Sequence, residues 1–242
     1  RLSLVGSEMC IRDRRAAAGA AARPGWSWKA EGVGDSYNVW MSAAPRHPAD
    51  MGIVGLRMTA EEYLALGETP ERMELIEGVV VMPPSPTTRP WRMVRMILRQ
   101  LEEFGDAGPG LEVFADTDVL VRPTLVYRPS ICAYAPGRFA EFPERLRVAP
   151  DLVVEVLSPS NRALDLVTKR DDFGRFGVTD YWVVDPDNGQ VRAWRRAEAG
   201  GGMVAVEVQG DLIEAEGLKG FVLDLLPIRE FVRRIDREGR SS

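Results

Sequence analysis

The sequence predicts a mixed α/β fold in which a β-sheet is flanked by helices within a single domain. Three observations support this prediction. The apolar run at residues 152–157 has the composition of a strand that is buried on both faces. Further strand patterns precede and follow this run. Helix patterns lie among them, near residues 59–66, 90–104 and 227–235.

Length and composition narrow the classes of function. A chain of 242 residues suits one domain of ordinary size with extensions, and 45% hydrophobic with 28% charged residues is typical of soluble globular proteins. No apolar run is long enough to span a membrane. The net charge of −5 argues against broad electrostatic attraction to nucleic acid. Any role on DNA must therefore depend on local basic patches.

Cysteine and histidine are scarce. Cys10 and Cys132 cannot form a disulfide framework or a cysteine zinc site. Cys132 has no histidine beside it in the sequence, which favours a packed thiol over a nucleophile. The single histidine, His47, lies in a leader that is expected to be disordered. These observations argue against histidine-based catalysis and histidine-rich metal sites.

The N-terminal segment is excluded from fold reasoning. The chain begins with Arg1, and its opening letters RLSLVGSEMCIRDR (residues 1–14) resemble a translated sequencing adapter. Arg15–Ala49 is rich in Ala, Gly, Pro and Arg and lacks apolar periodicity. Met41 and Met51 are both plausible true starts. We expect a non-native or disordered leader over residues 1–54.

The organised domain is expected over residues 55–235, followed by a disordered tail over 236–242. The chain shows no secretory leader pattern, and a cytoplasmic location is therefore expected. No internal repeat, phosphate-binding glycine loop or nucleophile elbow is found.

The expected elements follow a regular order. Thr59 with Glu61 and Glu62 has the pattern of a helix N-terminus. Two strands are then predicted in Met73–Met82, with a turn at Glu77-Gly78. A helix at Pro90–Phe104 follows, and then two strands in Leu111–Pro136 that are joined around Pro123. Further strands are predicted at Asp180–Val184, Gln190–Trp194 and Met203–Val208, with a closing helix at Pro227–Ile235.

The helix at Pro90–Phe104 is amphipathic. Its apolar face carries Val94, Ile97, Leu98 and Leu101. The opposite face carries three arginines, Arg92, Arg95 and Arg99. Two interpretations remain open for this basic stripe: a solvated surface, and a surface that contacts the DNA backbone.

The central stretch, Pro150–Lys169, carries the chemistry. Glu155 lies within the buried strand, and a buried glutamate is usually paired or bound to a metal. Asp165 and Lys169 follow one helical turn apart. This arrangement suits metal-assisted phosphodiester chemistry. The alternative is a structural ion pair between Glu155 and Lys169 or an arginine.

Several segments together resemble one known family. They are MELIEGVVVMPPSP, PDLVVEVLSPS, the Asp165-to-Lys169 spacing, FGRFGVTDYWVVDP and LDLLPIREFV. Over about Met58 to Val232 the chain resembles the Uma-type putative restriction endonuclease family. That family is a bacterial branch of the PD-(D/E)XK nuclease superfamily, whose fold is restriction endonuclease-like.

The resemblance implies hydrolysis of DNA phosphodiester bonds with Mg²⁺ or Mn²⁺. An Asp and a Glu hold the cation, and a lysine positions water or stabilises developing negative charge. By position the metal-binding glutamate is Glu155, and the lysine is Lys169 with Asp165 beside it. Glu74 is expected to support the metal ligands from outside. These four residues form the expected catalytic set.

Two departures from the family pattern stand at this site. Ser130 takes the position of the metal-binding Asp, and a neutral hydroxyl is a poor ligand for a hard cation. Asp151 cannot replace it, because four residues of strand separate its Cα from that of Glu155 by roughly 13 Å. Asp116 and Asp118, on a neighbouring predicted strand, remain candidates. Metal binding is therefore expected to be weakened.

The second departure is Pro90-Trp91, which stands where the family usually has His-Gln.

Two hypotheses follow for the function. The first is a Mg²⁺-dependent DNA endonuclease, with DNA as substrate and a homodimer as a possible assembly. The second is a catalytically impaired nuclease-fold protein that serves as a nucleic-acid or protein binding module.

Other conspicuous residues have ordinary explanations. Tyr181, Trp182 and Trp194 could stack on bases, but aromatic residues in apolar strands usually belong to the core. Basic residues gather after the central strand, at Arg162, Lys169, Arg170 and Arg175. They line the approach of a phosphate backbone if the nuclease hypothesis holds, and otherwise offset neighbouring aspartates.

Overall fold

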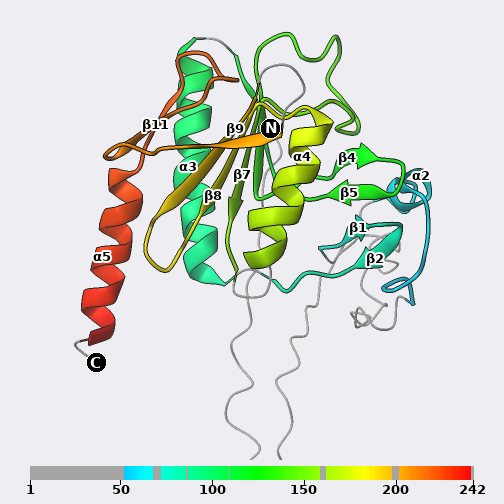
Figure 1. Cartoon of the computed structure of the whole chain (residues 1–242), viewed down its shortest axis with the longest axis horizontal. Helices are drawn as coiled ribbons and strands as arrows, with labels where there is room; N and C mark the ends of the chain where they lie inside the picture. The colour runs from blue at the N-terminus through cyan, green and yellow to red at the C-terminus, as the bar shows by residue number, and fades with distance from the viewer. Residues whose placement is uncertain are drawn as a thin grey trace, which may run out of the picture. The chain divides into compact units, whose positions relative to one another are not determined.

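The computed structural model describes residues 52–67, 72–85, 87–108, 110–158, 162–197 and 202–240. Most of the expected leader lies outside these ranges. The described chain contains a six-stranded sheet, a four-stranded sheet and a two-stranded hairpin, with helices packed against them (Figure 1). The predicted mixed α/β class is confirmed. No helix in the described ranges is long and apolar enough to cross a membrane.

The six-stranded sheet is the centre of the domain. Its order is β10-β9-β8-β7-β6-β3, and only the β7–β8 pair is parallel among its pairings. The strands are β3 (Glu112–Ala115), β6 (Ile131–Tyr134), β7 (Leu152–Val156), β8 (Asp180–Val184), β9 (Val191–Arg196) and β10 (Met203–Val206). Every residue of β7 and β8 is buried, as the apolar run predicts.

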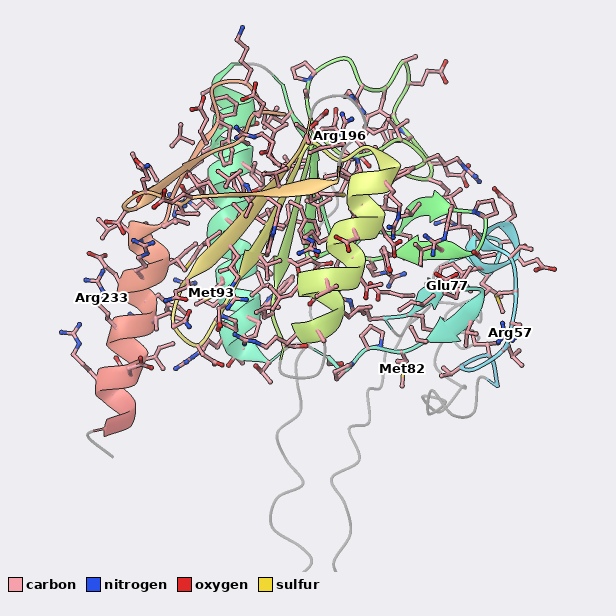
Figure 2. All side chains as sticks on the ribbon, in the orientation of Figure 1. Arg57, Glu77, Met82, Met93, Arg196 and Arg233 are labelled. Atoms are coloured by element: carbon pink, nitrogen blue, oxygen red, sulfur yellow. The ribbon has the colours of Figure 1, made fainter. Side chains whose placement is uncertain are left out.

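The smaller sheet has the order β2-β1-β5-β4 and is antiparallel. It contains β1 (Glu74–Ile76), β2 (Val79–Val81), β4 (Val119–Arg122) and β5 (Leu125–Tyr127). The predicted turn at Glu77-Gly78 is confirmed, with φ of 50° and 75° at these two residues. Figure 2 labels Glu77 at this turn, where it forms an ion pair with Arg122 of β4.

The predicted pair of strands in Leu111–Pro136 is wrong, because four strands are present. Asp116 has a φ of 52° and breaks the first predicted strand between β3 and β4. Residues 128–130 break the second between β5 and β6. Each break moves the chain from one sheet to the other, which an apolar pattern alone does not reveal. The hairpin of β11 (Leu212–Glu214) and β12 (Val222–Asp224) is also absent from the prediction.

The helices cover both faces of the six-stranded sheet (Figure 1). On one face, α3 (Thr88–Ala107) buries Met93, Val94, Ile97 and Leu101, and α5 (Leu226–Arg240) adds Ile228 and Val232. On the other face, α4 (Arg170–Phe176) buries Phe173. Since α5 continues to Arg240, residues 236–240 are helical, although the sequence assigned them to a disordered tail.

A short helix covers the smaller sheet. In α2 (Ala60–Leu64), Thr59 and Glu62 form a capping box: the Thr59 side chain accepts from the Glu62 amide, and the Glu62 carboxylate accepts from the Thr59 amide. Tyr63 and Leu64 pack with Leu75 and Val126 of the sheet. The N-terminal signature predicted at Thr59 is therefore confirmed.

Candidate functional site

Glu155 faces the side of the sheet that carries α4. Side chains alternate along a strand, so Leu152, Val154 and Val156 pack on the α3 side, whereas Val153 packs on the α4 side. Glu155 shares the orientation of Val153. The parallel crossover from β7 to β8 passes over this same face, because the helical segment connects the two strands. The glutamate and the helix are thus brought together by the chain connection itself.

The crossover begins with an unusual turn. Residues Leu164–Lys169 form a π-helix (η3), which continues directly into α4. Its buried side chains are Asp165 and Lys169, whereas Val167 is exposed. The Tyr181 hydroxyl donates to the Asp165 carbonyl at 2.8 Å and fixes the backbone there. π-turns are rare and recur at functional sites.

Four residues form what we call the acid–lysine cluster: Glu74, Glu155, Asp165 and Lys169. The Lys169 Nζ donates to Glu74 Oε1 at 2.9 Å and to Glu155 Oε1 at 3.0 Å. It lies 3.5 Å from Asp165 Oδ1. Each of the four residues is at most 3% exposed. The structure therefore brings together the four residues that the sequence predicts as a catalytic set.

The segment between β5 and β6 supports both glutamates. The Arg128 amide donates to Glu74 Oε1 at 2.9 Å. Two residues later, the Ser130 amide and hydroxyl both donate to Glu155 Oε2, each at 3.0 Å. The Ser130 Oγ in turn accepts from the Val156 amide at 3.1 Å. Ser130 thus occupies one oxygen of Glu155 with neutral donors, where the family pattern has a carboxylate.

Tyr127 is a neighbour of the cluster that sequence reasoning missed. It is fully buried, and its ring centroid lies 5.2 Å from the Lys169 Nζ. Its hydroxyl donates to Asp172 Oδ2 at 2.7 Å, and Arg122 and Arg175 donate to Asp172 Oδ1. Asp172 follows Lys169 by three residues, so this contact fixes the helix that carries the lysine. The only sequence signal is a tyrosine directly before the RPS segment.

The cluster holds more negative than positive charge. Three carboxylates face one ammonium group, so two negative charges are in excess when all are ionised. Burial and, to a smaller extent, the charge of Glu155 together raise the pKa of Asp165 to about 7, against the opposing effect of Lys169. Burial acts to lower the pKa of Lys169, but the charges of Glu155 and Glu74 outweigh it and raise that pKa. Lys169 therefore stays charged at any physiological pH.

The raised pKa of Asp165 predicts a pH dependence of stability. Its folded pKa of about 7 exceeds its ordinary value of 3.8, so between these pH values the folded state binds more protons than the unfolded state. Stability from this group is therefore present at low pH and is lost as the pH rises toward 7. The free energy of unfolding of wild type minus that of Asp165→Asn should fall by roughly 4 kcal/mol between pH 4 and pH 8. Urea titrations across this range test this expectation, and a difference that does not change with pH would refute it.

Other acidic candidates lie outside the cluster. Asp116 pairs with Arg72 at 3.0 Å, and Asp118 pairs with Arg128 at 2.8 Å. Asp151 accepts from the Ala135 amide at 2.8 Å and pairs with Arg138. None of these carboxylates contacts Glu155 in the described structure, so none replaces the missing aspartate at position 130 there.

The remaining sequence candidates take structural roles. Tyr181 and Trp182 are buried in the core, as predicted, and Trp194 is half-buried. Cys132 is a packed thiol whose pKa is raised by burial. Arg170 and Arg175 pair with Asp171 and Asp172, which matches the expectation of local charge compensation. Arg162 pairs instead with Asp185, which follows β8. The predicted ion pair of Glu155 with Lys169 is also present.

The cluster has oxygen ligands of the type that Mg²⁺ prefers, and its excess negative charge favours a cation. Asp165 Oδ1 is buried and makes no hydrogen bond, although it lies 3.5 Å from the Lys169 ammonium group. Among the described residues, however, no group of three or more His, Cys, Asp or Glu side chains is placed to hold a metal ion. Because Mg²⁺ often binds through one or two carboxylates, with water and substrate phosphate completing its shell, the residues fit a site with few protein ligands.

Comparisons with known proteins identify the family and the fold. A family model described as "Uma2: Putative restriction endonuclease" matches residues 60–226. A crystal structure of a putative nuclease belonging to DUF820 from Anabaena variabilis has a similar fold, with a TM-score of 0.61 and 18% sequence identity. The similarity covers 72% of this chain and 99% of that chain. No curated protein matches the sequence.

Proposed function

This chain belongs to the Uma2 family of putative restriction endonucleases, and we propose from this membership and its acid–lysine cluster that it hydrolyses DNA phosphodiester bonds with a divalent cation. The observation that carries the proposal is the position of Lys169. Its ammonium group lies within hydrogen-bond distance of two glutamates from different sheets and close to Asp165 of its own helix. A purely structural ion pair needs one carboxylate, whereas this lysine is surrounded by three.

The residues of the cluster have separate tasks in this proposal. When bound, the cation would be held by Glu155 and would supply activation of water and stabilisation of phosphate charge. Lys169 donates hydrogen bonds from a permanently charged ammonium group, which suits it to stabilise negative charge on a phosphate oxygen. Glu74 accepts from Lys169 and from the Arg128 amide, and it thereby keeps the ammonium group in place. Ser130 orients Glu155 through two hydrogen bonds.

The expected activity is slow, cation-dependent nicking of DNA. Supercoiled plasmid incubated with the purified chain and Mg²⁺ or Mn²⁺ should convert to the open circular form, and EDTA should stop the conversion. Gel electrophoresis over a time course measures the rate. Absence of conversion with either cation, at protein concentrations well above the plasmid concentration, would contradict the proposal.

One observation favours a second candidate, a binding module without catalysis. The Ser130 hydroxyl donates a hydrogen bond to Glu155 Oε2, at the position where the family resemblance implies a metal-binding aspartate. Such a protein would bind DNA with equal affinity in the presence and absence of Mg²⁺ and would leave plasmid intact. The plasmid assay therefore separates the two candidates.

Two arginines of α3 are proposed to contact the DNA backbone. Arg92 and Arg95 are exposed and form no carboxylate pair in the described structure, whereas Arg99 pairs with Glu103 at 2.6 Å. In Figure 1, α3 begins at the end of the six-stranded sheet where β7 ends, which is the end nearest to Glu155. Because α3 and the cluster lie on opposite faces of the sheet, these arginines would contact a part of the DNA that extends past this end of the sheet, and not the phosphate at the cluster.

Removing both charges should weaken binding to DNA. The double variant Arg92→Ala/Arg95→Ala should reduce affinity for duplex DNA about tenfold at low salt and make the slope of log K against log salt shallower by about 2. Fluorescence anisotropy with EDTA present measures this without cleavage. Arg99→Ala is the matched control on the same helix, because its charge is already compensated by Glu103. Equal effects of both variants would contradict the assignment.

A further inference from the structure

Asp165 differs from the other buried acids around it. It is 3% exposed, yet its Oδ1 atom makes no hydrogen bond. The equally buried Asp172 accepts from Tyr127, Arg122 and Arg175, and Asp180 accepts from Arg195 and the Gly217 amide. An unsatisfied buried carboxylate oxygen is costly. This oxygen has only its ion pair with Lys169 at 3.5 Å and lacks the hydrogen bonds that the other two acids receive.

This oxygen faces the ammonium group of the acid–lysine cluster. Asp165 Oδ1 lies 3.5 Å from the same Lys169 Nζ that Glu155 Oε1 contacts at 3.0 Å. The ammonium group thus lies between these two carboxylates, which marks a position where positive charge is favoured. The hydrogen bond from the Tyr181 hydroxyl to the Asp165 carbonyl fixes the backbone at this residue.

Position 130 cannot provide a second carboxylate for a cation on Glu155. The Ser130 hydroxyl is fully engaged, since it donates to Glu155 and accepts from the Val156 amide. The acids of the neighbouring strands are engaged with arginines, as described above. Among the described acids near Glu155, Asp165 has an oxygen that makes no hydrogen bond and is held only by its 3.5 Å ion pair with Lys169.

We propose that Asp165 has taken over the role of the missing aspartate and binds a divalent cation together with Glu155. This inference rests on the proposed cation dependence of the site. It assigns the second protein ligand to the helix of the crossover rather than to the strand before β7. The substitution at position 130 then relocates the cation site toward the helix and does not abolish it.

The inference is tested by cation binding in the absence of DNA. Isothermal titration calorimetry with Mn²⁺ would be applied to the wild type, Asp165→Asn, Ser130→Asp and the double variant Ser130→Asp/Asp165→Asn. Asp165→Asn should bind Mn²⁺ at least about tenfold more weakly than the wild type. The double variant should recover affinity, because the introduced aspartate would restore a carboxylate beside Glu155. Asp171→Asn, a partly exposed acid on the same helical segment paired with Arg170, is the matched control and should bind Mn²⁺ like the wild type.

A stability measurement guards against misfolded variants. Without metal, Asp165→Asn should be as stable as the wild type or more stable at pH 8, because it removes an uncompensated buried charge. Mn²⁺ should raise the melting temperature of the wild type by mass action, and it should raise that of Asp165→Asn much less. Wild-type Mn²⁺ affinity in folded Asp165→Asn, or no Mn²⁺ binding by the wild type, would overturn the inference.

These outcomes are separable from those of the proposed function. Mn²⁺ binding that depends on Asp165 in a protein that leaves plasmid intact would support the ligand assignment and refute the nuclease. Cleavage of plasmid by a protein whose Mn²⁺ affinity is unaffected by Asp165→Asn would support the nuclease and refute Asp165 as a ligand.

Discussion

Replacing Lys169 by methionine should destabilise the domain by about 3–5 kcal/mol, because it leaves a buried group of carboxylates without its cation. Methionine keeps most of the volume of the side chain, so the expected loss comes from charge and not from a cavity. Glu74, Glu155 and Asp165 would then face one another without an ammonium group between them. Urea unfolding at pH 8 measures the effect.

The matched control for this variant is Lys219→Met, since Lys219 is exposed. That change should alter stability by no more than about 0.5 kcal/mol. The cost of Lys169→Met should also shrink as the pH falls, because protonation of the carboxylates removes the repulsion. Similar costs for the two variants would show that Lys169 is not the charge that compensates the cluster.

Replacing Glu155 by glutamine should abolish cation-dependent nicking of plasmid. Loss of groups that merely support metal ligands typically costs about 10–100-fold, so loss of the ligand itself should lower the rate by at least about 100-fold. Glutamine has nearly the same shape and can still accept a hydrogen bond from Ser130, so the strand should remain folded. Plasmid assays at saturating Mn²⁺, together with a thermal melt of each protein, measure the two properties separately.

Glu214→Gln provides the control for this experiment. Glu214 is an exposed glutamate on β11, and its substitution should leave both the melting temperature and the nicking rate unchanged. If Glu155→Gln nicked plasmid at the wild-type rate, the cleavage would originate from another site or from a contaminating nuclease.

Much of the candidate site could be predicted because its parts are local in the sequence. Glu155, Asp165 and Lys169 lie on one strand and the helix that follows it, so the apolar run and a one-turn spacing place them together. Glu74 is different. It lies 95 residues from Lys169 in the sequence, and only the family resemblance indicated its place. The role of Ser130 as a donor to Glu155 depends on the path of the chain between two sheets, which no sequence pattern describes.

The same distinction explains the errors in the predicted fold. The capping box at Thr59 and the turn at Glu77-Gly78 are short-range features, and both are present. The break at Asp116 depends on a left-handed backbone conformation that aspartate adopts only in a suitable tertiary setting. The β11–β12 hairpin has three-residue strands, which are too short to produce a periodic signal.

The central claim is that the acid–lysine cluster binds a divalent cation through Glu155. Crystals of the protein soaked in Mn²⁺, with diffraction data collected near the manganese absorption edge, test it most directly. We predict an anomalous difference peak within coordination distance of a Glu155 oxygen, with Asp165 as the neighbouring ligand. A well-ordered cluster without such a peak, with Lys169 still bonded to both glutamates at saturating Mn²⁺, would contradict the claim.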